Sequence, residues 1–230
     1  MKIAIFRVDA SSQVGSGHVM RCLNLARVLQ TKNVRNVFIC RACDGNLIPQ
    51  ISKEFEVFSL NYLNVSKNNL LGCSQEKDAE DTIRVLNKNK LSKFNYLIID
   101  HYGLDIIWEE KIQNKFRNLV NNFRCLVIDD FNDRKHSCDV FLDQNVIEIN
   151  KFHTSYLSRD KTRLYGPYFS LLSKQYAYYK RQLKLKKKIK KVLIFFGGVD
   201  KNKLTLRVLK ILADRKFKDL IFEVVIGTNN

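Results

Sequence analysis

The amino-acid sequence predicts an α/β protein built on a doubly wound parallel sheet, and three observations support this class. Short apolar runs alternate with longer amphipathic stretches, the pattern of strands that alternate with helices. Two of the runs, Tyr96–Asp100 (YLIID) and Cys125–Asp129 (CLVID), are unbroken and end in a carboxylate. Such runs suit strands that are buried on both faces of a parallel sheet. A glycine-containing segment also separates the first expected strand from the first expected helix, as in Rossmann-like domains.

The elements expected in the first part of the chain follow from the spacing of apolar residues, which form short runs in strands and recur at helical spacing in helices. In chain order they are strand Lys2–Val8, helix Val19–Gln30, strand Val37–Arg41, helix Leu47–Glu54, strand Val57–Leu60, helix Asp78–Asn87 and the two strands named above.

A second unit of the same kind is expected towards the end of the sequence. The basic run at residues 183–191 (LKLKKKIKK) is interpreted as a solvated connector, although such a run could also bind a polyanion. Strand Val192–Phe196, helix Leu204–Ala213 and strand Ile221–Ile226 follow it. We therefore expect an N-terminal Rossmann-like domain over residues 1–183 and the start of a second one over residues 184–230. A complete domain of this class needs about 100 residues, so the second is expected to be truncated.

The composition indicates where the protein acts, but it does not identify the molecule that the protein binds. Lys and Arg number 40 against 23 Asp and Glu, a formal net charge of +17, which favours polyanionic partners in general. Because lysine is spread along the whole chain, compositional bias explains the charge better than a nucleic-acid role. No secretory signal and no apolar run of bilayer length is present. Among the six cysteines only Cys40 and Cys43 have the spacing of a redox or zinc half-site, and no second pair or nearby histidines complete it. We expect a cytoplasmic protein that does not bind membranes, with Cys40 in the core.

The strongest local signal is the segment Gly15-Ser16-Gly17-His18 between the first strand and the first helix. Glycines permit a tight turn and a close approach of the backbone to a ligand, and a helix N-terminus attracts anions. The same helix end disfavours the charged form of a histidine, and a neutral imidazole can accept a proton from water. His18 could instead cap the helix or pack beside it, and the spacing leaves both interpretations open.

A second signal is the segment DHYG at residues 100–103, directly after an apolar strand. Ligands of open α/β sheets bind beyond the carboxyl ends of the strands, which makes Asp100, His101 and Tyr102 candidates for a ligand site. Aspartates also follow other expected strands, at positions 9, 129 and 130. Any of these aspartates could instead cap the next helix.

The remaining histidines, His136 and His153, lie in polar segments away from strand ends and are expected on the surface. No zinc-protease, phosphate-loop or serine-hydrolase motif occurs in the sequence. We therefore expect no metal and no cofactor.

Five ordered segments together resemble one family: FRVDASSQVGSGHVMRCLNLA, LIIDHYGLD, VIDDFNDRKHSCDVFLDQN, LYGPYFSLL and FFGGVDKNKLT. They are similar to the UDP-2,4-diacetamido-2,4,6-trideoxy-β-L-altropyranose hydrolases of pseudaminic acid biosynthesis. The resemblance extends from Ile3 to about Gly227 and implies a glycosyltransferase-B-like architecture of two domains. It also implies hydrolysis of a UDP-sugar, with water attacking the anomeric carbon and no metal required.

The resemblance assigns roles to particular residues. His18 corresponds to the catalytic histidine, the general base, and Tyr102 corresponds to a tyrosine that lines the sugar site. Arg7 and Arg21 flank the glycine loop and are candidates for stabilising the departing phosphate, although either could instead form a surface ion pair. We expect His18 to be exposed in a cleft near Tyr102.

The family's GGTDxxNLT motif implies substrate contacts from Gly197, Gly198 and Asp200. The segment reads GGVDKNKLT here, so a threonine and an asparagine of the motif are replaced. The family's second domain would supply most nucleotide contacts and would continue past Asn230.

Two other functions remain open besides the hydrolase. A glycosyltransferase on the same architecture would pass the sugar to an acceptor instead of water. A binding module, such as a nucleic-acid binder, would use the positive charge, but no docking motif supports it. Our prediction is a monomer that acts on a small UDP-sugar and binds no nucleic acid, or an inactive fragment of such an enzyme.

Overall fold

The computed structural model describes residues 1–230 apart from residues 132, 147–160, 183–187, 198–199, 201 and 228–230. The chain forms two compact units, Met1–Leu172 and Ser173–Asn230. The domain boundary expected from the sequence, at residue 183, lies about ten residues further along the chain.

The first unit is built on a seven-stranded sheet in which every neighbouring pair of strands is parallel. The strand order is β3-β2-β1-β4-β5-β6-β7, which reverses direction beside β1 and places a topological switch between β1 and β4. The strands are β1 (Lys2–Val8), β2 (Val34–Arg41), β3 (Glu56–Leu60), β4 (Tyr96–Asp100), β5 (Arg124–Ile128), β6 (Val140–Asp143) and β7 (Thr162–Tyr165).

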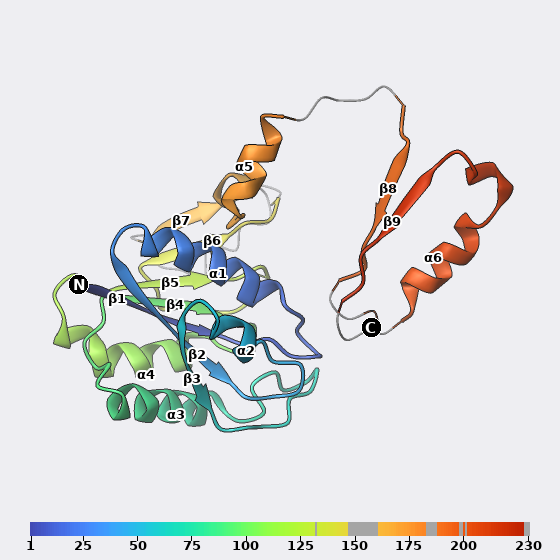
Figure 1. Ribbon diagram of the computed structural model, residues 1–230. Helices are drawn as coiled ribbons and strands as arrows, with labels where there is room; N and C mark the ends of the chain where they lie inside the picture. The colour runs from blue at the N-terminus through green and yellow to red at the C-terminus, as the bar shows by residue number, and fades with distance from the viewer. Residues whose placement is uncertain (132, 147–160, 183–187, 198–199, 201, 228–230) are drawn as a thin grey trace. The chain divides into compact units, whose positions relative to one another are not determined.

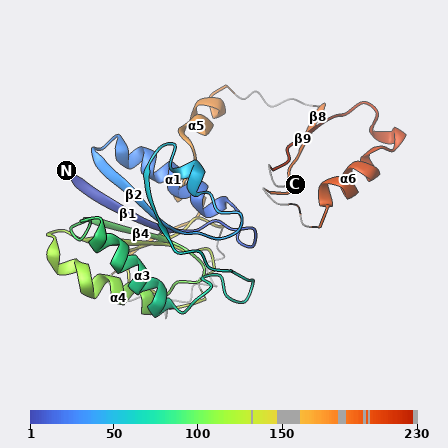
Figure 2. The same cartoon turned by 60° about the horizontal axis from the view of Figure 1, so that its bottom comes forward.

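Helices cover both faces of this sheet, which confirms the doubly wound class (Figure 1, Figure 2). On one face lie α1 (Gly17–Gln30) and the short α2 (Ile48–Ile51), and on the other lie α3 (Gln75–Lys88) and α4 (Ile106–Phe116). Right-handed crossovers from β1 to β2 and from β4 to β5 run in opposite directions along the sheet, so their helices cover opposite faces.

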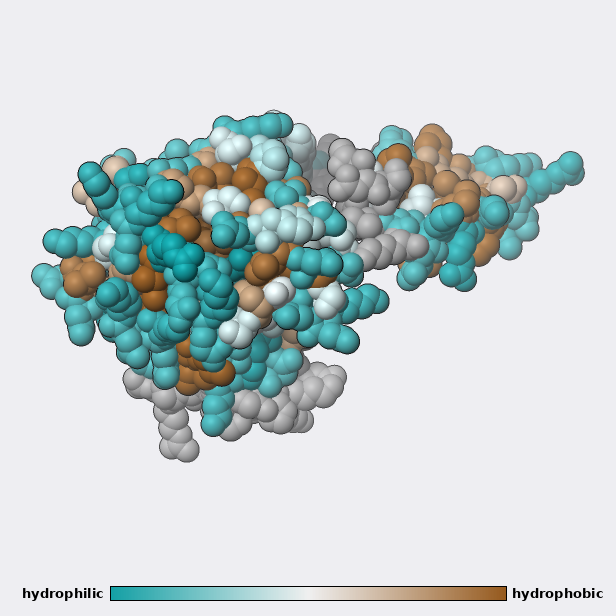
Figure 3. Space-filling model, turned by 90° about the horizontal axis from the view of Figure 1, so that it is seen from below, coloured by the Kyte–Doolittle hydropathy of each residue, from teal (hydrophilic) through white to brown (hydrophobic). Residues whose placement is uncertain are grey.

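The alternation of side chains along β1 divides the core into two layers. Ala4, Phe6 and Val8 pack with α1, whereas Ile5 packs in the layer that α3 and α4 cover. All four side chains have no exposed surface, as expected for a central parallel strand. On the surface, hydrophilic side chains cover most of the side of the molecule on which α3 lies, and small hydrophobic patches lie between them (Figure 3).

Several elements differ from the sequence-based expectation. Helix α1 begins at Gly17, so His18 lies inside its first turn. Helix α4 was not expected, although Asp105 caps its N-terminus by accepting a hydrogen bond from the amide of Ile107 at 2.8 Å. Strands β6 and β7 have only four residues each, too few to show a clear apolar period. A 3₁₀ helix at Arg117–Leu119 follows α4, and another, Pro167–Phe169, follows β7.

The second unit contains one strand–helix–strand repeat. Its strands β8 (Lys191–Ile194) and β9 (Ile221–Val224) are parallel, and helix α6 (Leu204–Leu212) connects them, followed by a 3₁₀ helix at Arg215–Phe217. Helix α5 (Lys174–Lys180) precedes β8. Among the described residues of either unit, no helix is both long and apolar enough to cross a membrane.

Candidate functional site

Five polar side chains meet where β4 and β5 end and α1 begins. His18 and Arg21 come from the first turns of α1, Asp100 is the last residue of β4, and Tyr102 and Asp130 follow β4 and β5. We call them the His18 cluster. Their position at the carboxyl edge of the sheet, beside the topological switch, is where open α/β sheets bind ligands.

Arg21 holds two carboxylates in this cluster. Its Nε donates to Asp100 Oδ2 and one terminal nitrogen donates to Asp100 Oδ1, both at 2.6 Å. The other terminal nitrogen donates to both oxygens of Asp130, at 2.9 and 2.8 Å. Since Arg21 is only 9% exposed and its guanidinium is engaged on both sides, the expected role in stabilising a departing phosphate does not fit its position in this structure.

Asp100 fixes the tautomer of His18. Burial favours the neutral carboxylic acid, but the hydrogen bonds from Arg21 and His18 outweigh it, so the pKa of Asp100 is lowered and the group is ionised. An ionised carboxylate only accepts hydrogen bonds, and Asp100 contacts Nδ1 of the histidine. The proton of a neutral His18 therefore lies on Nδ1, which leaves the lone pair on Nε2.

Tyr102 packs beside His18, as expected from the sequence. The two ring centroids are 4.3 Å apart in an edge-on arrangement, and the Tyr102 hydroxyl donates to Asp130 Oδ2 at 2.7 Å. Burial and the neighbouring Asp130 raise the pKa of Tyr102, so the hydroxyl keeps its proton. His18 itself is only 5% exposed, which corrects the expectation of an exposed histidine in a cleft. The contacts with Asp100 and Tyr102 bury its ring.

The glycine loop before α1 forms a tight turn. Gly15 has a φ of +85° and its amide donates to the carbonyl of Ser11 at 2.8 Å. Ser16 occupies the N-cap position of α1, yet its side chain makes no capping hydrogen bond. A Cβ atom added at Gly17 would meet no atom within 4 Å, so the space beside this residue in the first turn of α1 is open.

Two other candidates lie in a separate buried network. Arg7 has no exposed surface and donates to Asp78 at 3.0 and 2.8 Å and to Asp9 at 2.6 Å. Arg41 also donates to Asp78, at 2.7 Å, and His101 Nε2 lies 3.1 Å from Asp9. Arg7 and His101 are therefore enclosed by protein, which does not fit the expected contact with substrate. The network ties β1 and β2 to α3.

The expectation for His136 was wrong. This histidine is 7% exposed, and its Nδ1 lies 2.6 Å from Glu109 of α4 while its Nε2 lies 3.3 Å from Asp129. Burial alone would lower the pKa of His136, but its hydrogen bonds to Asp129 and Glu109 raise it to about 9. Its partners are separated from it in sequence and no local pattern reveals them. His153 lies outside the described residues.

The candidates in the second unit have local roles in this structure. Asp200 accepts hydrogen bonds from the amides of Leu204 and Thr205, at 2.8 and 2.7 Å, and so caps α6. Gly197 has a φ of +88°, which a glycine adopts without strain. Gly198 lies outside the described residues. Within the described parts of the chain, no group of three or more His, Cys, Asp or Glu side chains could hold a metal ion.

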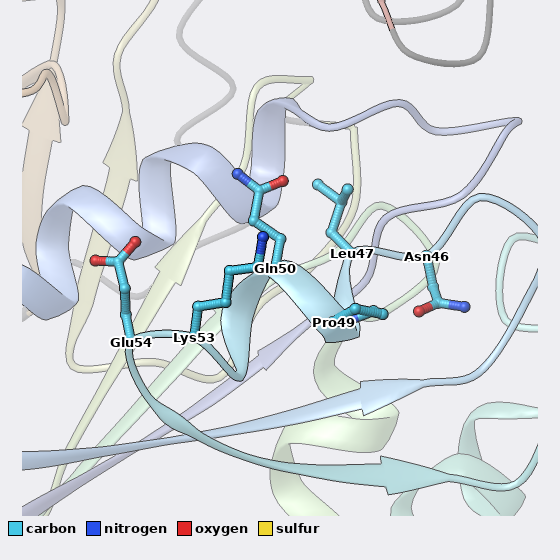
Figure 4. A pocket seen from close by; sticks show the side chains of 6 residues that line it. All are labelled: Asn46, Leu47, Pro49, Gln50, Lys53 and Glu54. Carbon is cyan, nitrogen blue, oxygen red and sulfur yellow. The ribbon is translucent and has the colours of Figure 1, made fainter.

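Two surface pockets lie apart from the His18 cluster. One, of about 400 Å³, is lined by residues of α2 and its flanks, with the side chains of Gln50, Lys53 and Glu54 extending towards α1 (Figure 4). The other, of about 420 Å³, is apolar and lies between α1 and strands β4 to β7. Neither has a residue of the His18 cluster in its lining, so the candidate site is identified from the chemistry of its side chains.

Comparison with known proteins gives distant relatives. No protein-family model matches the chain. The UDP-2,4-diacetamido-2,4,6-trideoxy-beta-L-altropyranose hydrolase of Campylobacter jejuni is 33% identical over 145 residues, which cover 63% of this chain and 42% of the hydrolase. The uncharacterized protein MJ1062 of Methanocaldococcus jannaschii is 28% identical over 233 residues, which cover 99% of this chain and 43% of that protein. The chain thus spans less than half the length of these curated relatives.

Among solved structures, the crystal structure of Acinetobacter baumannii MurG is similar with a TM-score of 0.55 and 11% sequence identity. The match covers 100% of this chain and 69% of the MurG chain. At this identity the likeness concerns the fold alone, and it confirms the glycosyltransferase-B-like α/β class. The chain is a distant relative of a UDP-sugar hydrolase, on a glycosyltransferase-B-like fold.

Proposed function

We propose that this chain carries the catalytic histidine of an enzyme that hydrolyses a UDP-linked 2,4-diacetamido-2,4,6-trideoxy sugar to UDP and the free sugar. The observation that carries the proposal is the contact between His18 Nδ1 and the ionised carboxylate of Asp100. A carboxylate that fixes the tautomer and orientation of an imidazole is the arrangement that prepares a histidine for general-base catalysis.

In the proposed reaction, Nε2 of His18 removes a proton from water as the water oxygen attacks the anomeric carbon. The bond between that carbon and the phosphate oxygen breaks, and UDP leaves with the electron pair. Asp100 stabilises the imidazolium that forms, because it lies against Nδ1 and keeps its negative charge. Release of the proton to solvent returns His18 to its starting form.

The start of α1 is the best candidate for contact with the diphosphate. Arg7 and Arg21 are both engaged with buried carboxylates, so neither is placed to meet a phosphate in this structure. The backbone amides of the first helical turn carry a partial positive charge, and the open space at Gly17 lets a ligand approach them. Gly15, Ser16 and Gly17 thus keep the substrate-binding role that the sequence suggests. The contacts of Gly197, Gly198 and Asp200 with substrate also remain part of the proposal.

The identity of the sugar rests on resemblance and not on geometry. The Campylobacter jejuni relative is named as a hydrolase of a UDP-linked diacetamido-trideoxy sugar, and its similarity to this chain supports the same substrate class and the pseudaminic acid pathway. A monomeric, cytoplasmic enzyme is part of the same proposal. A glycosyltransferase remains the second candidate, because MurG-like folds by themselves do not fix the acceptor.

The test is release of UDP from the UDP-linked sugar by the purified chain, with and without added acceptor sugars. We expect release without any acceptor, and its loss in His18→Ala. Lys111→Ala, which removes an exposed cation of α4 paired with Glu80, is the control and should keep wild-type activity. Equal release by the wild type and His18→Ala would refute the proposal, and absence of release would refute hydrolysis by this chain alone. Release that requires an acceptor sugar would favour the glycosyltransferase.

A further inference from the structure

An exposed phenylalanine extends the His18 cluster towards solvent. Phe131 follows the two aspartates at the end of β5 and is 58% exposed. Its ring centroid lies 4.4 Å from that of Tyr102, whose ring centroid lies 4.3 Å from that of His18. Three rings therefore run from the buried histidine to the surface. A single exposed apolar residue is common, but one in contact with the candidate site requires a reason.

The backbone that carries Phe131 is anchored to the core. Its amide donates to Asp129 Oδ1 at 3.4 Å, and Asp129 has no exposed surface. Arg134 donates to the same carboxylate at 3.0 Å, and His136 joins it to Glu109 of α4. Because these contacts hold Phe131, Arg134 and His136, a ligand that packs against Phe131 orders little additional chain.

The surroundings of Phe131 define the kind of ligand that would use it. The Tyr102 hydroxyl is engaged with Asp130, so the two aromatic rings present apolar surface next to a charged network. A sugar whose ring carries methyl groups also combines an apolar face and a polar face. Its C–H and methyl groups lie on one side and its polar substituents on the other. Aromatic rings pack against such apolar faces, while buried polar groups fix the orientation.

We propose that Phe131 and Tyr102 together form a wall that binds the apolar face of a methyl-bearing deoxysugar, with Phe131 determining the preference for such sugars. This inference rests on the proposed function for the choice of substrate. It assigns to Phe131 a binding role and no part in proton transfer, so its loss should raise KM and leave kcat nearly unchanged.

The first experiment compares steady-state hydrolysis by Phe131→Ala, Phe131→Trp and the wild type. We expect KM to rise about tenfold in Phe131→Ala, with kcat within about threefold, since an aromatic packing contact has roughly this effect. Phe131→Trp keeps an aromatic face and should restore KM. Leu119→Ala, which removes an apolar side chain that is 46% exposed in the 3₁₀ helix after α4, is the matched control.

The second experiment measures binding without turnover. The chain has one tryptophan, Trp108, which is fully buried and hydrogen-bonded to Asp78 at 3.0 Å, so its fluorescence should not respond to ligands. In Phe131→Trp, the free methyl-bearing deoxysugar should cause a saturable change in fluorescence. UDP alone should cause none.

The outcomes separate this inference from the proposed function. UDP release that depends on His18, with an unchanged KM in Phe131→Ala, would overturn the role of Phe131 and leave the hydrolase standing. A saturable fluorescence change with the sugar, in a chain that releases no UDP, would support the wall and refute hydrolysis. If neither release nor a fluorescence change occurs, the binding role of Phe131 and hydrolysis by this chain alone are both refuted.

Discussion

Replacement of Asp100 by asparagine separates the proposed dyad from a merely structural cluster. Each oxygen of Asp100 accepts a hydrogen bond from Arg21 at 2.6 Å, one from Nε and one from a terminal nitrogen. Asparagine offers a single acceptor oxygen, so in either orientation its NH₂ group faces an N–H group of Arg21. The substitution therefore leaves the buried guanidinium of Arg21 with one carboxylate fewer. It also removes the carboxylate that holds the proton of His18 on Nδ1.

The expected magnitudes follow from this geometry. Loss of one partner from a buried ion pair costs about 3–5 kcal/mol, and the isosteric asparagine should place the loss near the lower end. Loss of the carboxylate that orients a catalytic histidine lowers kcat by about a thousandfold to ten-thousandfold. Urea denaturation measures the first effect and initial rates of UDP release measure the second.

Glu80→Gln is the matched control, because it also turns a carboxylate into an amide but lies in an exposed pair with Lys111. We expect both its stability and its rate to be those of the wild type. A folded Asp100→Asn protein with undiminished kcat would refute the role of Asp100 in orienting His18. If the variant is lost to unfolding at every denaturant concentration, the buried pair contributes more than our estimate, and that estimate is then wrong.

Three further predictions concern stability and binding. The pKa of His136 is raised from 6.5 to about 9, so its stabilising contribution is complete below pH 6.5 and is lost as pH rises through 9. The free energy of unfolding should thus fall by about 3 kcal/mol more in the wild type than in His136→Gln over that interval, measured by urea denaturation; equal falls would contradict this. Gly17→Ala should leave stability unchanged or raise it by up to about 1 kcal/mol, because nothing lies within 4 Å of the new methyl group, yet weaken UDP binding measured by calorimetry. Unchanged UDP affinity would contradict the proposed contact between the diphosphate and the start of α1. Arg7→Met should destabilise the fold by about 3–5 kcal/mol, since it leaves buried Asp78 with fewer partners, and folded protein should keep a wild-type KM.

The sequence predicted the fold well because the strands carry strong local signals. The bounds of β1 and β4 are those expected, and the strands around the topological switch are long apolar runs. Strands β6 and β7 are short and partly polar, so the pattern that identifies a buried strand is too brief to detect there.

The candidate site was predicted in outline, because strand ends and helix starts gather at one edge of a parallel sheet. Contacts between residues far apart in sequence were not predictable in the same way, such as the pairing of Arg21 with Asp100 and Asp130. For Arg7 a signal did exist. Alternation along β1 places it on the same face as Ile5, opposite to the face that α1 covers, and so away from His18.

The most direct test of the central claim is hydrolysis in water enriched in oxygen-18, followed by mass spectrometry of both products. If His18 activates water for attack on the anomeric carbon, the label appears in the free sugar and not in UDP, and neither product forms with His18→Ala. Label in the terminal phosphate of UDP would show attack at phosphorus and contradict the proposed mechanism. Products that both lack label would show that water is not the acceptor, and would contradict hydrolysis itself.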